Sequence, residues 1–173
     1  EYAELGMDLG WAYARWQAFP LAEREFTELA KQQPGEGDAL FGSGYAQYKQ
    51  NKLPEARRNL SQALKSKSAP TIRHVWVVFP AMGAYPIFAD AQTMLGWVDL
   101  VGGDCGRARK TFSLALEENP EMVSAMTGLA ACHQKNGELS KARDWYVQAA
   151  EIYPEYPAVV TGLQATRPGQ GKR

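Results

Sequence analysis

A fixed spacing of 34 residues constrains this chain more than any other feature of its sequence. Ala22 recurs as Ala56, and Ala108 recurs as Ala142, with the same shift of 34 residues in both pairs. A period of this length is typical of repeat architectures, in which one unit cannot bury its own apolar face and stacked neighbours do so instead. The period therefore predicts a stack of similar units rather than a single closed core.

The spacing breaks once, near the middle of the chain. From Ala56 to Ala108 the shift is 52 residues, which is 18 more than the period. The sequence thus predicts four units in two pairs, separated by an insertion. The expected boundaries are two repeats in residues 3–70, an apolar insertion with prolines in 71–88, two repeats in 89–156, a capping helix in 157–166 and a flexible tail in 167–173.

Each unit is predicted to contain two helices. Small and apolar residues recur at spacings of three and four, as in Ala108, Phe112 and Ala115, which is the spacing of one helix face. Pro20 and Pro54 fall where the second helix of a unit is expected to begin. Proline suits the first turn of a helix, because its missing N–H would have no partner there.

The repeated pattern resembles the tetratricopeptide repeat. The family pattern of Leu-Gly, Tyr, Ala-x3-Phe and Pro is met in the first unit and largely in the third, by Leu9, Gly10, Tyr13, Ala22, Phe26 and Pro34 and by Leu95, Gly96, Ala108, Phe112 and Pro120. The leading tryptophan of the family is replaced by Gly6, Leu40, Gln92 and Met126. The resemblance implies an all-α, right-handed superhelix (α-solenoid) of helix-turn-helix repeats, with a C-terminal capping helix.

A concave groove lined by the first helix of each repeat is implied by the same resemblance. Soluble helices normally turn polar residues outward on their second face, whereas this face is rich in aromatic residues. An exposed aromatic surface usually marks an interaction site. Two alternatives stay open: Trp11 covers a further repeat upstream, or the insertion folds back and buries the stripe. The candidate groove residues are Met7, Trp11, Arg15, Phe41, Tyr45, Tyr48, Lys49, Trp97, Gln134 and Lys135.

A line of cations runs along the same face. Arg15, Lys49 and Lys135 occupy equivalent positions in their units. Such a line is suited to an acidic peptide or a carboxylate. Each cation also lies near the end of its helix, where the helix dipole favours positive charge without any ligand.

The insertion has a different character from the repeats. The run from Val75 to Phe79 is β-branched and aromatic, which predicts an extended segment. Pro86 is expected to open the next helix. Three hypotheses follow: the insertion lies across the concave face as a plug, recognises a partner or a second copy, or dips into a membrane interface. Its candidate contact residues are Val75, Trp76 and Phe79.

Composition argues against several classes of function. Lys plus Arg equals Asp plus Glu, 19 of each, so the basic excess typical of nucleic-acid binders is absent. No apolar run reaches the roughly 18 residues of a membrane span. The pattern contains no catalytic constellation, metal-ligand motif or phosphate-binding loop, so neither enzyme activity nor a cofactor is expected. Cys105 and Cys132 fall on neighbouring helices, where they are either a disulfide or two buried thiols.

The sequence therefore predicts a non-catalytic scaffold that docks a partner protein or peptide through the aromatic groove, the apolar insertion, or both. One alternative is a structural spacer or self-assembly module, in which the insertion joins copies into a homo-oligomer. Another is a carbohydrate-contacting module of a bacterial export machine. Because the chain begins at Glu1 without a methionine, we interpret it as a fragment. The compartment, cytoplasm or bacterial periplasm, stays open.

Overall fold

The computed structural model describes residues 2–66, 73–79 and 83–168, with side chains described for 5–66 and 90–168. The predicted solenoid of helix pairs is confirmed. The predicted tail beyond residue 168 lies outside the described residues. The helices are α1 (Tyr2–Arg15), α2 (Phe19–Gln32), α3 (Gly37–Lys49), α4 (Leu53–Ala63), α5 (Ala91–Val101), α6 (Cys105–Glu118), α7 (Val123–Lys135), α8 (Leu139–Ile152) and α9 (Pro157–Ala165).

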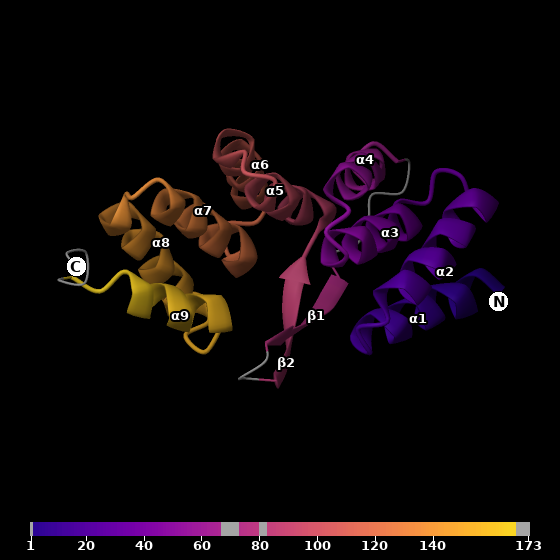
Figure 1. Cartoon of the computed structure of the whole chain (residues 1–173), viewed down its shortest axis with the longest axis horizontal. Helices are drawn as coiled ribbons and strands as arrows, with labels where there is room; N and C mark the ends of the chain where they lie inside the picture. Colours follow the sequence, from indigo (N-terminus) through magenta and orange to yellow (C-terminus); the bar gives the residue numbers. More distant parts are fainter. Residues whose placement is uncertain (1, 67–72, 80–82, 169–173) are drawn as a thin grey trace.

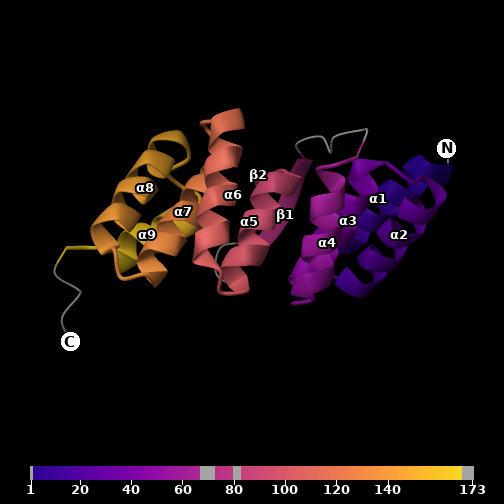
Figure 2. The ribbon, with the colours of Figure 1, turned by 90° about the horizontal axis from the view of Figure 1, so that it is seen from above.

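The helices form an arch of two layers. The first helices of the units, α1, α3, α5 and α7, contact one another in chain order, and α9 continues the row. Each second helix packs against the first helix of its own unit and that of the next. Figure 1 shows the arch from the side, and Figure 2 shows the same helices stacked in a row from the N-terminus to the C-terminus.

An aromatic ring inserted between two glycines joins the third unit to the fourth. Phe112 on α6 is wholly buried, and its ring lies against Gly96 on α5 and Gly128 on α7. A Cβ atom on Gly96 would stand 2.5 Å from the nearest Phe112 atom, and one on Gly128 would stand 2.3 Å away. Real Cβ atoms do not approach so closely. The ring therefore occupies the space that a side chain would take on either helix.

The same arrangement recurs elsewhere in the row. Phe26 on α2 lies between Gly10 on α1 and Gly42 on α3, where an added Cβ would in each case stand 2.6 Å from the ring. Tyr146 on α8 lies against Gly162 on α9 at 2.3 Å by the same measure. Because α9 receives a ring in the same way as α3 and α7, it packs as the first helix of a further unit.

The second unit departs from this arrangement. Leu60 replaces the aromatic residue, and a Cβ atom on Gly44 would stand 2.7 Å from it. On the next helix, α5, Met94 stands at the position that Gly42 and Gly128 hold on α3 and α7. Both Leu60 and Met94 are buried in the same apolar cluster. Two aliphatic side chains thus replace the ring and the glycine at the junction between α4 and α5.

A β-hairpin is inserted at this junction. Its strands are β1 (Arg73–Phe79) and β2 (Gly83–Ala89), which pair antiparallel with Arg73 opposite Ala89. The predicted extended course of residues 75–79 is confirmed, whereas the side chains of Val75, Trp76 and Phe79 lie outside the described side chains.

The position expected for Pro86 is wrong. This residue lies within β2, opposite Trp76, and does not open a helix. Helix α5 begins at Ala91, and its cap is Asp90, whose carboxylate accepts a hydrogen bond from the Thr93 N–H at 2.6 Å. Proline is tolerated in a strand that lies at a sheet edge, and both strands of a two-stranded sheet are edges.

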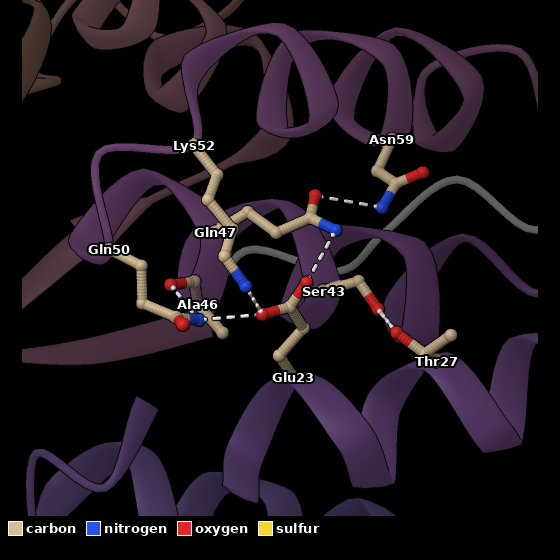
Figure 3. A network of polar contacts seen from close by, with 8 residues as sticks. All are labelled: Glu23, Thr27, Ser43, Ala46, Gln47, Gln50, Lys52 and Asn59. Atoms are coloured by element: carbon tan, nitrogen blue, oxygen red, sulfur yellow. Dashed lines mark hydrogen bonds and ion pairs between the residues drawn. The ribbon is translucent and has the colours of Figure 1, made fainter. Parts of the chain in front are cut away.

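A polar network fastens the first two units, and Figure 3 shows its members. Glu23 on α2 accepts hydrogen bonds from Gln47 at 3.1 Å and from Gln50 and Lys52 at 2.7 Å each. Asn59 on α4 donates to Gln47 at 2.9 Å, which extends the network to the next helix. Burial raises the pKa of Glu23, but the hydrogen bonds from Lys52, Gln47 and Gln50 outweigh it and lower that pKa below its ordinary value of 4.5.

Replacing Gly128 by alanine tests the ring–glycine packing. The new Cβ atom would collide with Phe112, so Gly128→Ala should lower the free energy of unfolding by about 1–3 kcal/mol in urea denaturation. The matched control is Gly106→Ala on α6, where the nearest atom to an added Cβ lies 3.4 Å away. That change should leave stability unchanged or slightly raised, because alanine is a better helix former. Equal losses in the two variants would contradict the packing argument.

A Glu23→Gln variant tests the polar network through pH. A carboxylate whose pKa is lowered by folding stabilises the folded state at pH values above its ordinary pKa. That contribution disappears as the pH falls below 4.5 and through the lowered value. The stability difference between the parent chain and Glu23→Gln should therefore be largest near neutral pH and shrink toward pH 3. A difference that is constant with pH would show that the charge of Glu23 contributes nothing.

Candidate functional site

The predicted aromatic stripe is partly a packed cluster between α1 and α3. The Trp11 ring lies 5.0 Å from Phe26, 5.9 Å from Phe41 and 5.8 Å from Tyr45, measured between ring centroids. Phe41 is 0% exposed and Tyr45 is 2% exposed. The expectation that these two rings are exposed is wrong, because rings from α1 and α2 cover them. Trp11 itself is half-buried at the edge of the cluster.

The rest of the N-terminal groove residues lie closer to solvent. Met7, Tyr48 and Lys49 are half-buried, and Arg15 is exposed. Burial raises the pKa of the Tyr48 hydroxyl and lowers that of the Lys49 ammonium. The Lys49 ammonium lies 5.6 Å from the centre of the Phe19 ring, within the range of a cation–π contact. Met7, Tyr48 and Lys49 therefore form the accessible part of this side of the groove.

Trp97 anchors the C-terminal side of the groove. Its ring lies edge-on to Phe112 at 5.5 Å, and its Nε1–H donates a hydrogen bond to the Ser124 hydroxyl at 3.0 Å. Trp97 is half-buried, so part of its ring stays accessible. Gln134 is half-buried as well, and its amide oxygen accepts a hydrogen bond from the Tyr146 hydroxyl at 3.2 Å.

The three cations of the predicted line belong to three different helices. Lys135, which is exposed, places its ammonium 3.4 Å from the carbonyl oxygen of Leu100, near the end of α5. Lys49 contacts Phe19, and Arg15 ends α1. The contact between Lys135 and a carbonyl at a helix end agrees with the dipole interpretation. Lys49 and Lys135 are thus engaged by the fold itself.

Tyr156 belongs to the site and escaped the sequence analysis. It caps α9, is 5% exposed and shares a hydrogen bond with Ser124, the residue that also holds Trp97. Burial raises the pKa of Tyr156 to about 12, the Ser124 hydrogen bond lowers it, and the nearby Tyr48 adds to the rise. Tyr48 and Tyr156 therefore lie within electrostatic range across the arch. Tyr156 follows Pro154, outside the repeated face, so the period gave no signal for it.

The hairpin lies on the concave side of the arch. The backbone of β1 contacts α1, and that of β2 contacts α5 and α7. These helices carry Trp11, Trp97 and the Gln134–Lys135 pair of the candidate groove. Figure 1 shows the hairpin in the opening of the arch, below α3 and α5. The concave side thus consists of the first helices together with the hairpin.

No catalytic or metal-binding arrangement is found among the residues with described side chains. They contain no cluster of three or more His, Cys, Asp and Glu side chains suited to a metal ion. His133 is paired with Glu138, whose carboxylate oxygen lies 2.8 Å from the His133 Nδ1. In the part of the chain that the structure describes, no helix combines the length and the apolarity that crossing a membrane requires.

A buried carboxylate at the junction between α4 and α5 is a second residue that the sequence analysis missed. The Asp99 side chain is 2% exposed and forms an ion pair with Arg57 on α4. The Arg107 Nε atom lies 3.8 Å from the same Asp99 oxygen. A charged residue inside the apolar run from Leu95 to Val101 was the available signal. The pair joins the two halves of the arch just beside the base of the hairpin.

The comparisons with known proteins decide the family. The tetratricopeptide repeat family matches residues 7–71 and 93–157, which is well over half of the chain. The chain belongs to the tetratricopeptide repeat family. The matched ranges hold two units each and leave out most of the hairpin. Comparison with curated proteins gave no match.

Solved tetratricopeptide structures share the fold at low sequence identity. A MamA structure from Desulfovibrio magneticus RS-1 is 17% identical, covers 96% of this chain and 84% of its own, and has a TM-score of 0.70. YrrB, described as having an unusual peptide-binding site, is 16% identical over 93% of this chain and 74% of its own, with a TM-score of 0.62. The first repeat domain of Spaghetti (RPAP3), bound to an HSP90 peptide, is 16% identical over 78% and 92%, with a TM-score of 0.59.

The Arg57–Asp99 pair yields a prediction about how the two halves of the repeat array are joined. Arg57→Met removes the nearest cation from a buried carboxylate, which normally costs several kcal/mol. Because the Arg57 side chain is 37% exposed, we expect a smaller loss of about 1–3 kcal/mol in urea denaturation. The adjacent Arg58 is exposed and provides the control, since Arg58→Met should change stability by less than about 0.5 kcal/mol. Matching losses in both variants would contradict a specific role for the pair.

Proposed function

We propose that this chain is a non-catalytic scaffold that docks an extended segment of another protein on the concave side of the arch. The repeat family and the peptide-binding descriptions of YrrB and RPAP3 support a protein-interaction role in general. The observation that carries the finer proposal is the position of the hairpin against α1, α5 and α7. It makes the hairpin part of the surface that a partner meets.

Burial decides which residues a partner contacts. Phe41 and Tyr45 are enclosed by neighbouring rings and serve as the support of the groove. Met7, Tyr48 and Trp97 are half-buried and present part of their side chains on the same side. The docking surface therefore consists of these edges together with the apolar sequence of the hairpin. A preformed surface of this kind loses little conformational entropy on binding.

The partner best suited to this surface is an extended, largely apolar peptide. Lys49 and Lys135 already contact a ring and a helix-end carbonyl, so a strongly acidic partner is not required. The burial of Phe41 and Tyr45 also removes the flat exposed rings on which a sugar would stack. Self-assembly through the hairpin is the competing function, because a hairpin of two strands has two edges that can pair with a second copy.

Selection of peptides from a random displayed library on the intact chain tests the proposal. Selected peptides should be apolar, and their affinity should fall about tenfold or more in Tyr48→Ala and Met7→Ala variants, because both side chains edge the groove. Leu114→Ala and Val147→Ala, at exposed positions on α6 and α8, are matched controls and should bind like the parent chain. Affinity is measured by tryptophan fluorescence, and circular dichroism confirms that each variant is folded.

The competing function predicts different results in the same variants. If the chain is a self-assembly module, light scattering should show a dimer that Trp76→Ala or Phe79→Ala converts to a monomer. A monomeric chain that selects no peptide, or whose peptides bind the groove variants and the parent chain equally well, would contradict the docking proposal. Replacing residues 71–88 by a Gly/Ser linker separates the parts of the surface, since the proposal expects peptide affinity to decrease without the hairpin.

A further inference from the structure

Two thiols meet where the third repeat packs on the fourth. Cys105 is the first residue of α6, and Cys132 lies in the last turn of α7. The two helices pack against each other, and both cysteines belong to the apolar cluster around Phe112. Their side chains are close enough to share a hydrogen bond. Cys132 is 0% exposed, whereas Cys105 is only partly buried.

We propose that Cys105 and Cys132 are a thiol–disulfide exchange site, in which a small-molecule disulfide such as oxidised glutathione converts the two thiols into a disulfide that joins α6 to α7. Both cysteines are free thiols in this structure. The contact between their side chains means that closing the bond needs little movement of the backbone. The proposal is independent of the partner-docking function.

The two steps of the exchange follow from the different exposure of the two sulfurs. In the first step the Cys105 thiolate attacks one sulfur of oxidised glutathione, the S–S bond of the oxidant breaks, and one glutathione leaves and takes up a proton. In the second step Cys132 loses its proton to solvent and attacks the Cys105 sulfur, and the second glutathione leaves. Two cysteine thiols are thereby oxidised, and one oxidised glutathione is reduced to two thiols.

The surroundings of Cys132 make the order of these steps definite. Burial raises the pKa of Cys132, the charge and hydrogen bond of Cys105 raise it further, and the result is about 12. Cys132 in the reduced pair is therefore a poor first nucleophile. Once Cys105 is bound to glutathione it no longer carries a charge, so its contribution to that rise disappears. Arg109 and Lys135 lie near enough to lower the pKa of Cys132, and they favour its thiolate in the second step.

The disulfide would fix the contact between two successive repeats. It closes a loop from residue 105 to residue 132, which contains α6, the connection after it and most of α7. Such a loop restricts the unfolded chain and so stabilises the folded state. It also holds α6 and α7 at one relative position, on the same helix that contributes Gln134 and Lys135 to the candidate groove.

Titration of the purified chain with mixtures of oxidised and reduced glutathione tests the proposal. Intact mass spectrometry should show the loss of two hydrogen masses, with no glutathione attached, and the oxidised chain should melt about 5 °C or more above the reduced chain. Cys132→Ser should stop at one glutathione attached to Cys105, and Cys105→Ser should not react under the same conditions. Adding dithiothreitol should restore the original mass and melting temperature.

The proposal fails if the parent chain stops at a glutathione adduct or does not react. As a control for the chemistry, the chain unfolded in urea should form the disulfide or the adducts under the same buffer. If the folded chain forms the disulfide no faster than Cys105→Ser and Cys132→Ser form adducts, or if oxidation lowers the melting temperature, the pair is two ordinary buried thiols.

Discussion

The structure depends on one packing arrangement, an aromatic ring held between two helices that each contribute a glycine. Phe26 and Phe112 lie in such positions, and Tyr146 meets Gly162 in the same way. The ring belongs to a second helix, while the glycines belong to the first helix of the same unit and of the next. Because the ring touches both, it sets the distance within a unit and the distance between units at once. A period of 34 residues is the sequence expression of this contact.

The insertion occurs where this arrangement is absent. At the junction between α4 and α5 a leucine and a methionine replace the ring and the glycine, and the Arg57–Asp99 pair adds a polar link. An aliphatic pair makes no demand for a flat slot between two backbones, so the distance between the helices is less strictly fixed. The hairpin enters the chain at this junction, between a helix that ends at Ala63 and one that begins at Ala91.

The sequence was sufficient to predict the solenoid, because a ring between two glycines repeats visibly at a constant spacing. It was not sufficient to predict the exposure of the groove. Phe41 and Tyr45 lie on the expected face of their helix, but rings from α1 and α2 cover them, and no pattern within one helix reports such a neighbour. Tyr156 was missed for a related reason, since its partner Ser124 lies in the preceding unit. The strand around Val77 was predictable from β-branched residues, whereas its pairing with the segment around Pro86 was not.

The unequal junctions have a mechanical consequence. A solenoid behaves as a spring, and bending concentrates at its most compliant turn. In this chain that turn lies between α4 and α5, where aliphatic side chains and an ion pair replace a rigid ring. The hairpin is rooted there and reaches toward α1 on one side and α7 on the other. A small change of curvature at its base is therefore amplified at its tip, so the hairpin acts as a lever that converts flexing of the spring into movement within the arch.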